Sequence, residues 1–383
     1  MLKVLTIVGT RPEAIKMAPV VKELERRSEH VISRLCATAQ HREMLDQILS
    51  LFRIVPDYDL DLMRRAQTPA EVASQAIARL APLLEAERPD WVLVQGDTTT
   101  VLAASVAAFY ARVRIGHVEA GLRTHDLNRP FPEEGNRRIV GCLSDLHFAP
   151  TETSRQNLLR EGVSPHRILL TGNPVVDALN QMRESNGNSH GESRALEAIP
   201  AGRRLLLVTA HRRENFGAPL ESICEALREI AARYAGDVHI VYPVHRNPRV
   251  WDTAHRLLGD TPGVTLVPPV DYLSLVRLLK RCYLVLSDSG GLQEEAPCLG
   301  KPLLVLRDKT ERPEALEAGS IKLVGSSTRR IVEETSRLLD CESIYRSMSR
   351  PSFVYGDGNA ARRIVDGLLS HEQSREQAQK ENS

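Results

Sequence analysis

Short runs of hydrophobic residues alternate along the whole chain with longer segments that mix apolar and polar positions. The runs are KVLTIV, VISRLCA, WVLVQ, RIGHVE, LHFAP and RILLT in the first half, and RLLLVTA, VHIVYP, VTLVP, YLVLS, PLLVLR and IKLV in the second. Most are almost continuously apolar, which is typical of parallel strands covered on both faces. Helices are expected between them, for example over residues 70–87 and 220–235. The pattern therefore predicts an α/β protein with two doubly wound sheets.

The length of the chain also favours two domains, because 383 residues exceed what one hydrophobic core usually organises. We place the N-terminal domain at residues 1–171 and the C-terminal domain at 172–361, with the crossover near TGNPVVD. The polar stretch at residues 184–193 is interpreted as a surface loop of the second domain. The tail HEQSREQAQKENS has no apolar stripe and is expected to be frayed.

Composition and charge narrow the classes of function. The formal net charge is +1, so we expect no bulk attraction to nucleic acid or to a membrane surface, and any anion must be held by a local cluster. No apolar run is long enough to cross a bilayer, and MLKVLTIVG is interpreted as a buried first strand. The six cysteines include no C-x-x-C pair, which predicts reduced core thiols in a cytoplasmic protein and no metal site.

The segment SDSGGLQEEA follows the run YLVLS and leads into a predicted helix. Doubly wound sheets bind ligands beyond the carboxyl ends of their strands. Gly290 and Gly291 have no Cβ, so an oxyanion can approach their amides closely, and Ser287 and Ser289 carry hydroxyl donors. The segment indicates a phosphate cradle in which Glu295 would accept from a ribose diol. The alternative is a glycine-containing turn with a serine N-cap.

Basic residues follow other strands of the second half. His211 stands with Arg212 and Arg213 after RLLLV, His245 follows VHIVYP, and Arg312 lies in the loop after LLVLR. Carboxyl ends of parallel strands share one edge of the sheet, so these side chains are candidates for anion contacts; solvated surface charges are the alternative. This clustering predicts that the second domain holds a nucleotide.

Acidic residues mark the strand ends of the first half. Asp97 follows WVLVQ, Glu119 follows RIGHV, and Glu133 lies in a proline-rich loop. A single acid at a strand end is usually a helix cap. Three acids on successive connections, all able to face one cleft, instead suggest proton transfer, because gathered carboxylates are otherwise costly. Their repulsion would be offset by three basic residues of the same half, namely Arg11, Lys16 and Arg123.

A set of longer motifs occurs in order between residue 3 and about residue 366: GTRPEAIKMAPV, TAQHREMLDQ, GDTTT, HVEAGLRT, PFPEEGNRR, TGNPVVDAL, AHRREN, YPVH, SDSGGLQEEAPCLGKPLLVLRDKTERPEA and YGDGNAARRI. Together they closely resemble the non-hydrolysing UDP-N-acetylglucosamine 2-epimerases. The resemblance implies a glycosyltransferase-B architecture, with two Rossmann-like domains facing a cleft and a C-terminal helix at about residues 362–372 packing back on the first domain. It also implies interconversion of UDP-GlcNAc and UDP-ManNAc by a homodimer without metal or nicotinamide cofactor.

The resemblance implies roles for individual residues. In the implied mechanism a base removes the C2 proton while UDP leaves C1; UDP then re-adds to 2-acetamidoglucal as a proton returns on the other face. The acid/base carboxylates are Asp97, Glu119 and Glu133, and His211 joins the catalytic residues by stabilising the leaving diphosphate. The residues expected to bind the substrate are Arg11, Lys16, Ser289, Gly290, Gly291, Glu295 and Arg312.

The sequence departs from the family pattern at some positions. Val270 and Leu275 stand where many members have a glutamine and a phenylalanine beside the uracil. Of the positions that resemble the activator site of regulated members, Gln40 and His211 are present, but Ala66 replaces an arginine. Other functions stay open: an epimerase of a modified UDP-sugar such as a 2,3-diacetamido-glucuronic acid, a hydrolysing 2-epimerase, a glycosyltransferase, or a nucleotide-sugar sensor without catalysis.

Overall fold

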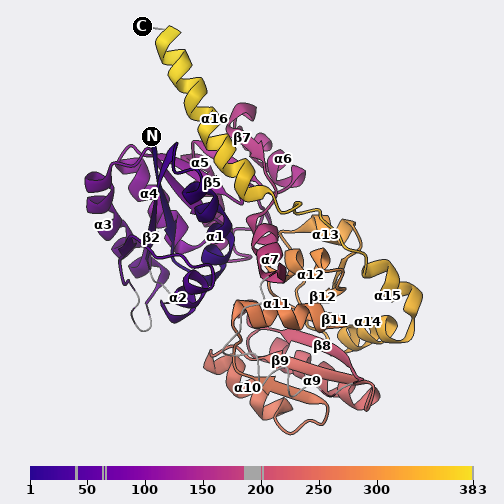
Figure 1. The fold of residues 1–383 in the computed structure, drawn as a ribbon. Helices are drawn as coiled ribbons and strands as arrows, with labels where there is room; N and C mark the ends of the chain where they lie inside the picture. The colour runs from indigo at the N-terminus through magenta and orange to yellow at the C-terminus, as the bar shows by residue number, and fades with distance from the viewer. Residues whose placement is uncertain (39–41, 63, 65–66, 185–199, 201, 382–383) are drawn as a thin grey trace. The chain divides into compact units, whose positions relative to one another are not determined.

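The computed structural model describes residues 1–38, 42–62, 64, 67–184, 200 and 202–381, which divide into two compact units (Figure 1). Unit 1 comprises Met1–Ala178 and Tyr355–Ser383, and unit 2 comprises Leu179–Val354. The chain thus leaves unit 1 within helix α7 and returns to it shortly before the last helix, α16. The sequence places this boundary between residues 171 and 172, and that domain limit stays a prediction. No helix in the described ranges is both long and apolar enough to cross a membrane.

Unit 1 is built on a seven-stranded parallel sheet in the order β3-β2-β1-β4-β5-β6-β7. Helices α3, α4 and α5 pack together, and α1 packs with α2 and α16, so helices cover both faces of the sheet (Figure 1). Its elements are β1 (Leu2–Val8), α1 (Arg11–Arg26), β2 (Val31–Ala37), α2 (Arg42–Leu51), β3 (Tyr58–Asp59), α3 (Pro69–Glu87), β4 (Trp91–Gln95), α4 (Thr99–Tyr110), β5 (Arg114–Val118), α5 (Glu133–Leu143), β6 (Leu146–Ala149), α6 (Glu152–Arg160), η1 (Pro165–Arg167), β7 (Ile168–Leu170), α7 (Pro174–Glu184, which continues into unit 2) and α16 (Ala360–Glu381).

Unit 2 has a six-stranded parallel sheet in the order β10-β9-β8-β11-β12-β13. Helix α9 packs against α10 and α14, and their apolar faces close one hydrophobic core over the sheet. Its elements are β8 (Arg204–Thr209), η2 (Arg213–Asn215), α9 (Ala218–Arg233), β9 (Val238–Pro243), α10 (Pro248–Leu258), β10 (Val264–Val267), α11 (Tyr272–Arg281), β11 (Leu284–Ser287), α12 (Leu292–Cys298), β12 (Leu303–Val305), α13 (Pro313–Glu317), β13 (Ile321–Leu323), α14 (Thr328–Asp340) and α15 (Glu342–Met348).

The strand order reverses once in each sheet. In unit 1 the reversal lies between β1 and β4, and in unit 2 it lies between β8 and β11, where Ser287 pairs with Thr209 at the carboxyl end. Ligands of doubly wound sheets bind beyond the carboxyl ends of strands at such a switch point. The loops after these four strands are therefore where a site is expected in each unit.

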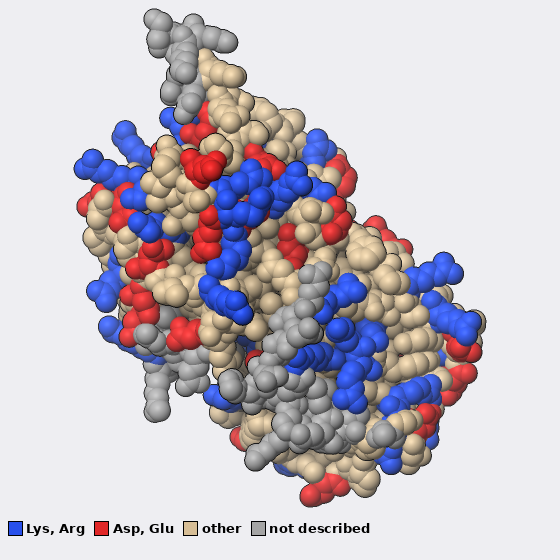
Figure 2. Space-filling model, viewed as in Figure 1, with Lys and Arg blue, Asp and Glu red and all other residues tan. Residues whose placement is uncertain are grey.

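Local sequence signals account for the helix starts beside these loops. Thr98 caps α4 by accepting from the amide of Val101 at 3.3 Å, and Thr68 forms a capping box with Glu71 at the start of α3. The continuously apolar strands are buried as expected, with all of β4 inaccessible to solvent. On the face shown in Figure 2, acidic and basic side chains lie interspersed over much of the surface, in keeping with the small net charge.

The predicted fold class is confirmed: both halves are doubly wound parallel α/β sheets, and every run named from the sequence forms a strand. The short β3 was not predicted. The prediction of a frayed tail is wrong for the part of the tail that the structure describes, because α16 continues to Glu381. A polar anchor replaces the missing apolar stripe: Glu372 accepts from the indole Nε1 of Trp91 at 3.1 Å and from Arg114. The loop at residues 184–193 lies almost entirely outside the described residues.

Candidate functional site

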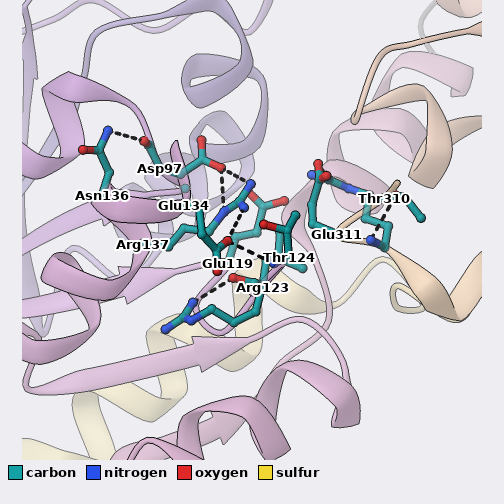
Figure 3. Close-up of polar contacts among 12 residues, drawn as sticks. Asp97, Glu119, Arg123, Thr124, Glu134, Asn136, Arg137, Thr310 and Glu311 are labelled. Atoms are coloured by element: carbon teal, nitrogen blue, oxygen red, sulfur yellow. Dashed lines mark hydrogen bonds and ion pairs between the residues drawn. The ribbon is translucent and has the colours of Figure 1, made fainter. Parts of the chain in front are cut away.

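Glu119, which is labelled in Figure 3, follows β5 in unit 1 and is buried. Its Oε1 accepts from Nζ of Lys16 at 2.5 Å and from Nδ2 of Asn173 at 2.9 Å, and its Oε2 accepts from the Gln95 amide. These donors stabilise the ionised carboxylate. The backbone of Glu119 has φ +63°, in the left-handed region that non-glycine residues seldom occupy. Strain of this kind is concentrated at functional sites, where the surrounding structure enforces it.

Asp97 follows β4 and is held by an arginine from α5. Nε and Nη2 of Arg137 both donate to Oδ2 of Asp97, at 2.9 and 2.6 Å, and Asn136 donates to the Asp97 carbonyl at 2.8 Å (Figure 3). Arg137 also donates to Oε2 of the buried Glu134 at 2.9 Å. Arg137 therefore connects Asp97 to the first turn of α5, where Glu133 lies.

The carboxylates predicted from the sequence gather at neighbouring strand ends of unit 1. A Cβ built on Gly96, the residue before Asp97, would lie 3.4 Å from Oε2 of Glu119. Glu133 is half-buried at the start of α5, and its Oε2 has no hydrogen-bond partner among the described residues. Asp97 keeps 26% of its side chain exposed, whereas Glu119 keeps 4%. Within the described part of the chain, Asp97 and Glu133 thus each retain a carboxylate oxygen that accepts no hydrogen bond.

Glu13, in the first turn of α1, is a buried carboxyl that the sequence did not single out. Its Oε2 accepts from the amide of Gly9 at 2.6 Å, and its Oε1 accepts from the hydroxyls of Thr98 at 2.6 Å and Thr10 at 3.0 Å. Burial raises the pKa of Glu13 to about 7, although these hydrogen bonds act in the opposite direction. A carboxyl that titrates near neutral pH therefore braces the loop that carries Asp97.

The basic residues of unit 1 differ in what they neutralise. Lys16, predicted to contact substrate, makes its short ion pair with Glu119, and both side chains are almost inaccessible. Arg123 forms a bidentate pair with Glu161, at 2.8 and 2.6 Å, so its main partner lies outside the three predicted carboxylates. Arg11 begins α1 half-buried. Arg137 supplies the positive charge beside Asp97. It was not predicted from the sequence, although it lies in the segment PFPEEGNRR.

The predicted phosphate cradle lies between β11 and α12 in unit 2. Neither Gly290 nor Gly291 has a positive φ, so the glycines are not required by backbone conformation. A Cβ on Gly290 would lie 2.8 Å from Nη1 of Arg312 and 3.3 Å from Nη2 of Arg212. Two guanidiniums therefore converge on Gly290. Within the described part of the chain, the amides of Gly290 and Gly291 donate to no other residue. Bare amides and two cations together suit an anion.

A chain of alternating charges, buried except for Glu214 at its end, holds Arg312 in place. Its Nε donates to Oε1 of Glu294 at 2.5 Å, and its Nη1 donates to Glu311. Glu311 accepts in turn from Arg307 at 3.1 Å, and Arg307 donates to Glu214 at 2.7 Å. Buried charges are tolerated when they are paired in this way. The network fixes the Arg312 guanidinium beside Gly290.

Other predicted residues of unit 2 are also placed at the switch point. His211 follows β8, and its ring stacks on His245 from the end of β9, with centroids 5.6 Å apart. Oε1 of Glu295 accepts from the Tyr272 hydroxyl at 2.7 Å. Ser287 is buried, and its Oγ contacts Thr209 Oγ1 at 2.6 Å and accepts from the amide of Ser289 at 2.9 Å. Ser287 therefore shapes the loop, and Ser289 is the serine beside the glycines.

Three further side chains of these switch points were missed from the sequence. Gln95 and Asn173 contact Glu119 in unit 1, and Asp288 binds the loop after β8 in unit 2. The sequence did contain a signal for Asp288, because an acid within the segment SDSGG is unexpected in a loop that binds an anion. It contained no such signal for the side-chain amides of Gln95 and Asn173. Gln40 and Ala66 of the activator comparison lie outside the described residues. Within those residues, no group of three or more His, Cys, Asp or Glu side chains could hold a metal ion.

Known proteins resemble this chain over almost its whole length. The family described as UDP-N-acetylglucosamine 2-epimerase matches residues 22–369. A UDP-N-acetylglucosamine 2-epimerase of Salmonella typhimurium is 53% identical over 374 residues, covering 97% of this chain and 99% of that protein.

Two solved structures share the fold. The UDP-GlcNAc 2-epimerase from Neisseria meningitidis, bound to UDP-GlcNAc, has a TM-score of 0.92 at 47% identity, covering 96% of this chain and 100% of that one. A Staphylococcus aureus homologue bound to UDP has a TM-score of 0.91 at 45% identity, covering 97% of each chain. The family model spans most of the chain, and the relatives and solved structures match it in sequence and in fold, so on both grounds the chain belongs to the UDP-N-acetylglucosamine 2-epimerase family.

Proposed function

We propose that this chain interconverts UDP-GlcNAc and UDP-ManNAc by epimerisation at C2, through elimination of UDP and its re-addition. The observation that carries the proposal is the pairing of two chemistries in one chain: an anion cradle at the switch point of unit 2 and a carboxylate group at that of unit 1. Relatives about half identical in sequence bear the name of this activity, and a structural neighbour holds UDP-GlcNAc.

The residues of unit 2 are assigned to the nucleotide. Gly290 and Gly291 offer amides, Arg312 a fixed guanidinium and His211 an imidazole to the diphosphate. Donors held in place before the reaction stabilise charge that develops as the leaving group departs, which is where preorganisation has most effect. Ser289 and Glu295 are assigned to the same ligand, as is Arg11 of unit 1.

The carboxylates of unit 1 are assigned to proton transfer. The C2 proton is not adjacent to a carbonyl, so elimination is the more accessible route: the C2–H and C1–O bonds break, a C1=C2 double bond forms, and UDP departs. We assign proton transfer to Asp97 and Glu133, because each keeps a carboxylate oxygen that accepts no hydrogen bond from the described residues. Glu119 already accepts hydrogen bonds from Lys16, Gln95 and Asn173, so it is better suited to holding the charges and side chains of the site in place.

The decisive experiment is the reaction of UDP-GlcNAc in heavy water. We expect deuterium at C2 of both UDP-sugars and no accumulation of free UDP beyond traces. Accumulation of UDP with free ManNAc would identify a hydrolysing enzyme, and UDP-GlcNAc binding without exchange would identify a sensor. Exchange that is faster with a UDP-2,3-diacetamido-glucuronic acid than with UDP-GlcNAc would identify an epimerase of that modified sugar.

Assembly and location complete the proposal. We infer that the enzyme is a cytoplasmic homodimer, as the family resemblance implies. Light scattering coupled to size-exclusion chromatography measures the mass directly, against 42.6 kDa for one chain. A mass of one chain at micromolar concentration would contradict the dimer.

A further inference from the structure

Asp288 is a fully buried acid at the centre of the unit 2 switch point, and the assignments above give it no role. Its Oδ2 accepts from the backbone amides of His211 and Arg212, both at 2.8 Å, and from Nδ2 of Asn215 at 2.9 Å. These three bonds tie the loop after β8 to the end of β11. One carboxylate oxygen therefore has a structural task.

The other oxygen of Asp288 faces an imidazole. Oδ1 lies 3.6 Å from Nδ1 of His211, and it has no hydrogen-bond partner among the described residues. At 3.6 Å the contact is longer than a hydrogen bond, but a small rotation of the ring about χ2 would close it. An unpartnered carboxylate oxygen in a fully buried position is costly, so the arrangement favours a donor at Nδ1.

From this geometry we propose that Asp288 is a positioning residue that keeps His211 protonated on Nδ1 and directs its Nε2–H toward the diphosphate. The inference rests on the proposed function, in which His211 contacts the leaving group. An acid behind a histidine sets which ring nitrogen carries the proton, and it stabilises the imidazolium. Asp288 would thereby let a histidine act as a cation toward an anionic ligand.

Other charged groups around His211 act against its protonation. His245 stacks on the ring, and Arg212 and Arg312 lie beside Gly290. Arg246 follows His245 on the same loop. Two stacked imidazoles do not readily carry charge together. The carboxylate of Asp288 lies 3.6 Å from Nδ1 of His211, so we expect it to decide which of the two histidines is charged.

The first test is an NMR titration of the imidazoles in the ligand-free protein. We expect His211 to titrate with a midpoint above about 6.5, the ordinary value for histidine, and above that of His245. Asp288→Asn should lower the His211 midpoint by about one to three pH units, because the opposite charge is removed while the amide oxygen still accepts from the loop. Asn215→Ser, which removes the hydrogen bonds from Asn215 to Asp288 and to the Leu306 carbonyl but keeps the charge, should leave the midpoint within a few tenths of a unit.

A wild-type midpoint for His211 below that of His245, or a midpoint that Asp288→Asn does not lower, would overturn the proposal. The wild-type value alone suffices if the variant does not fold.

The second test asks whether Asp288 acts on UDP through His211. Asp288→Asn should weaken UDP binding about tenfold at pH 7.5 and much less at a pH below the variant's own His211 midpoint, where both proteins carry the imidazolium. In a His211→Asn background the same change should cause no further loss, which a double-mutant cycle measures. Additive losses would show that Asp288 affects UDP independently of His211 and would overturn its positioning role. If wild-type protein does not bind UDP while the NMR midpoints behave as expected, the proposed function fails and the Asp288–His211 pair stands.

Discussion

The two switch points have the same strand order but opposite chemistry. In unit 1 the loops after β1, β4 and β5 carry acids that accept from donors of their own unit: Glu119 from Lys16, Asp97 from Arg137, and Glu13 from two hydroxyls and an amide. In unit 2 the loops after β8 and β11 carry bare glycine amides and guanidiniums, with Asp288 behind them. The topology provides a place for a ligand, and the residues that follow the strands decide its charge.

The two switch points also differ in how far their polar groups are paired with other groups of the protein. The acids of unit 1 are largely paired within the fold, because unpaired buried carboxylates are costly. In unit 2 the amides of Gly290 and Gly291 have no acceptor among the described residues, and the proposed function gives them one in the diphosphate. We therefore expect changes in unit 1 to act on turnover or stability, and changes in unit 2 to act on binding.

The largest effect is expected from removing a proton carrier in unit 1. Asp97→Asn and Glu133→Gln should each lower turnover by about 10² to 10⁴, because an amide keeps the shape but cannot act as a general base. UDP affinity should change by less than about threefold, since neither residue belongs to the cradle. Glu119→Gln should lower turnover as well, but it should also reduce stability, because the buried Lys16 loses the negative charge of Glu119.

The measurement combines C2 deuterium exchange, calorimetric UDP titration and thermal unfolding for each variant. Glu161→Gln is the matched control, because it removes a carboxylate from a bidentate arginine pair outside the site. Near-wild-type exchange in both Asp97→Asn and Glu133→Gln would make these residues structural, and the base would have to be sought elsewhere.

A smaller effect, confined to binding, is expected from a methyl group in the cradle. A Cβ on Gly291 would lie 3.7 Å from Glu295 Oε2 and 4.0 Å from Ser289 Oγ, so Gly291→Ala fits the unliganded protein without displacing any atom. It would nevertheless obstruct the approach of a diphosphate to the amide. The loss of one charge-assisted hydrogen bond weakens UDP binding by about ten- to a hundredfold.

Gly290→Ala is the informative partner of this variant. Its Cβ would lie only 2.8 Å from Nη1 of Arg312, so the guanidinium must shift, and we expect a larger loss of UDP affinity than for Gly291→Ala. Equal melting temperatures for wild-type and Gly291→Ala proteins are required for the comparison. Unchanged UDP affinity in a folded Gly291→Ala protein would remove the cradle assignment.

Much of this comparison could be predicted from the sequence, for a physical reason. Continuous apolar runs such as WVLVQ and YLVLS identify buried parallel strands, and the residue after such a strand necessarily lies at the ligand-binding edge. Asp97, Glu119, His211 and Gly290 were found by that rule. Their chemical type then indicated acids in one half and anion donors in the other.

The partners of these residues could not be predicted in the same way. Arg123 and Arg137 are equally plausible neighbours of Asp97 in the sequence, but only the packing of α5 brings Arg137 to it, while Arg123 pairs with Glu161. Which side chain completes an ion pair depends on tertiary distances rather than on spacing along the chain. The same limit explains the end of α16, where contacts of Glu372 with Trp91 and Arg114 lie beyond Leu368, the last buried apolar residue in the described part of the helix.

The smallest effect is expected at Glu13, and it separates the two ways in which unit 1 holds an acid. Glu119 has a cation, whereas Glu13 has only neutral donors and its pKa is raised to about 7 by burial. A carboxyl whose folded pKa lies above its unfolded value of 4.5 stabilises the fold fully below pH 4.5 and loses this contribution as pH rises through about 7. Glu13→Gln cannot ionise. The free energy of unfolding of Glu13→Gln, taken relative to that of wild type, should therefore rise by about 1–2 kcal/mol between pH 5 and pH 8. This is less than the roughly 1.4 kcal/mol that each unit of pKa shift would give in full, because the folded protein relaxes around the charged carboxylate.

Denaturant unfolding of both proteins at each pH measures this difference. Comparing the two at the same pH cancels the opposite trend from His117, which is buried and whose pKa is lowered to about 4, because both proteins contain it. Glu71→Gln is the control: its carboxylate is stabilised in the capping box of α3, where the amide of Thr68 lowers its pKa, so no gain is expected at pH 8. A difference in unfolding free energy between Glu13→Gln and wild type that stays constant from pH 5 to pH 8 would show that Glu13 ionises in the folded protein without cost. The loop that carries Asp97 would then be braced by a carboxylate at every pH at which the enzyme works.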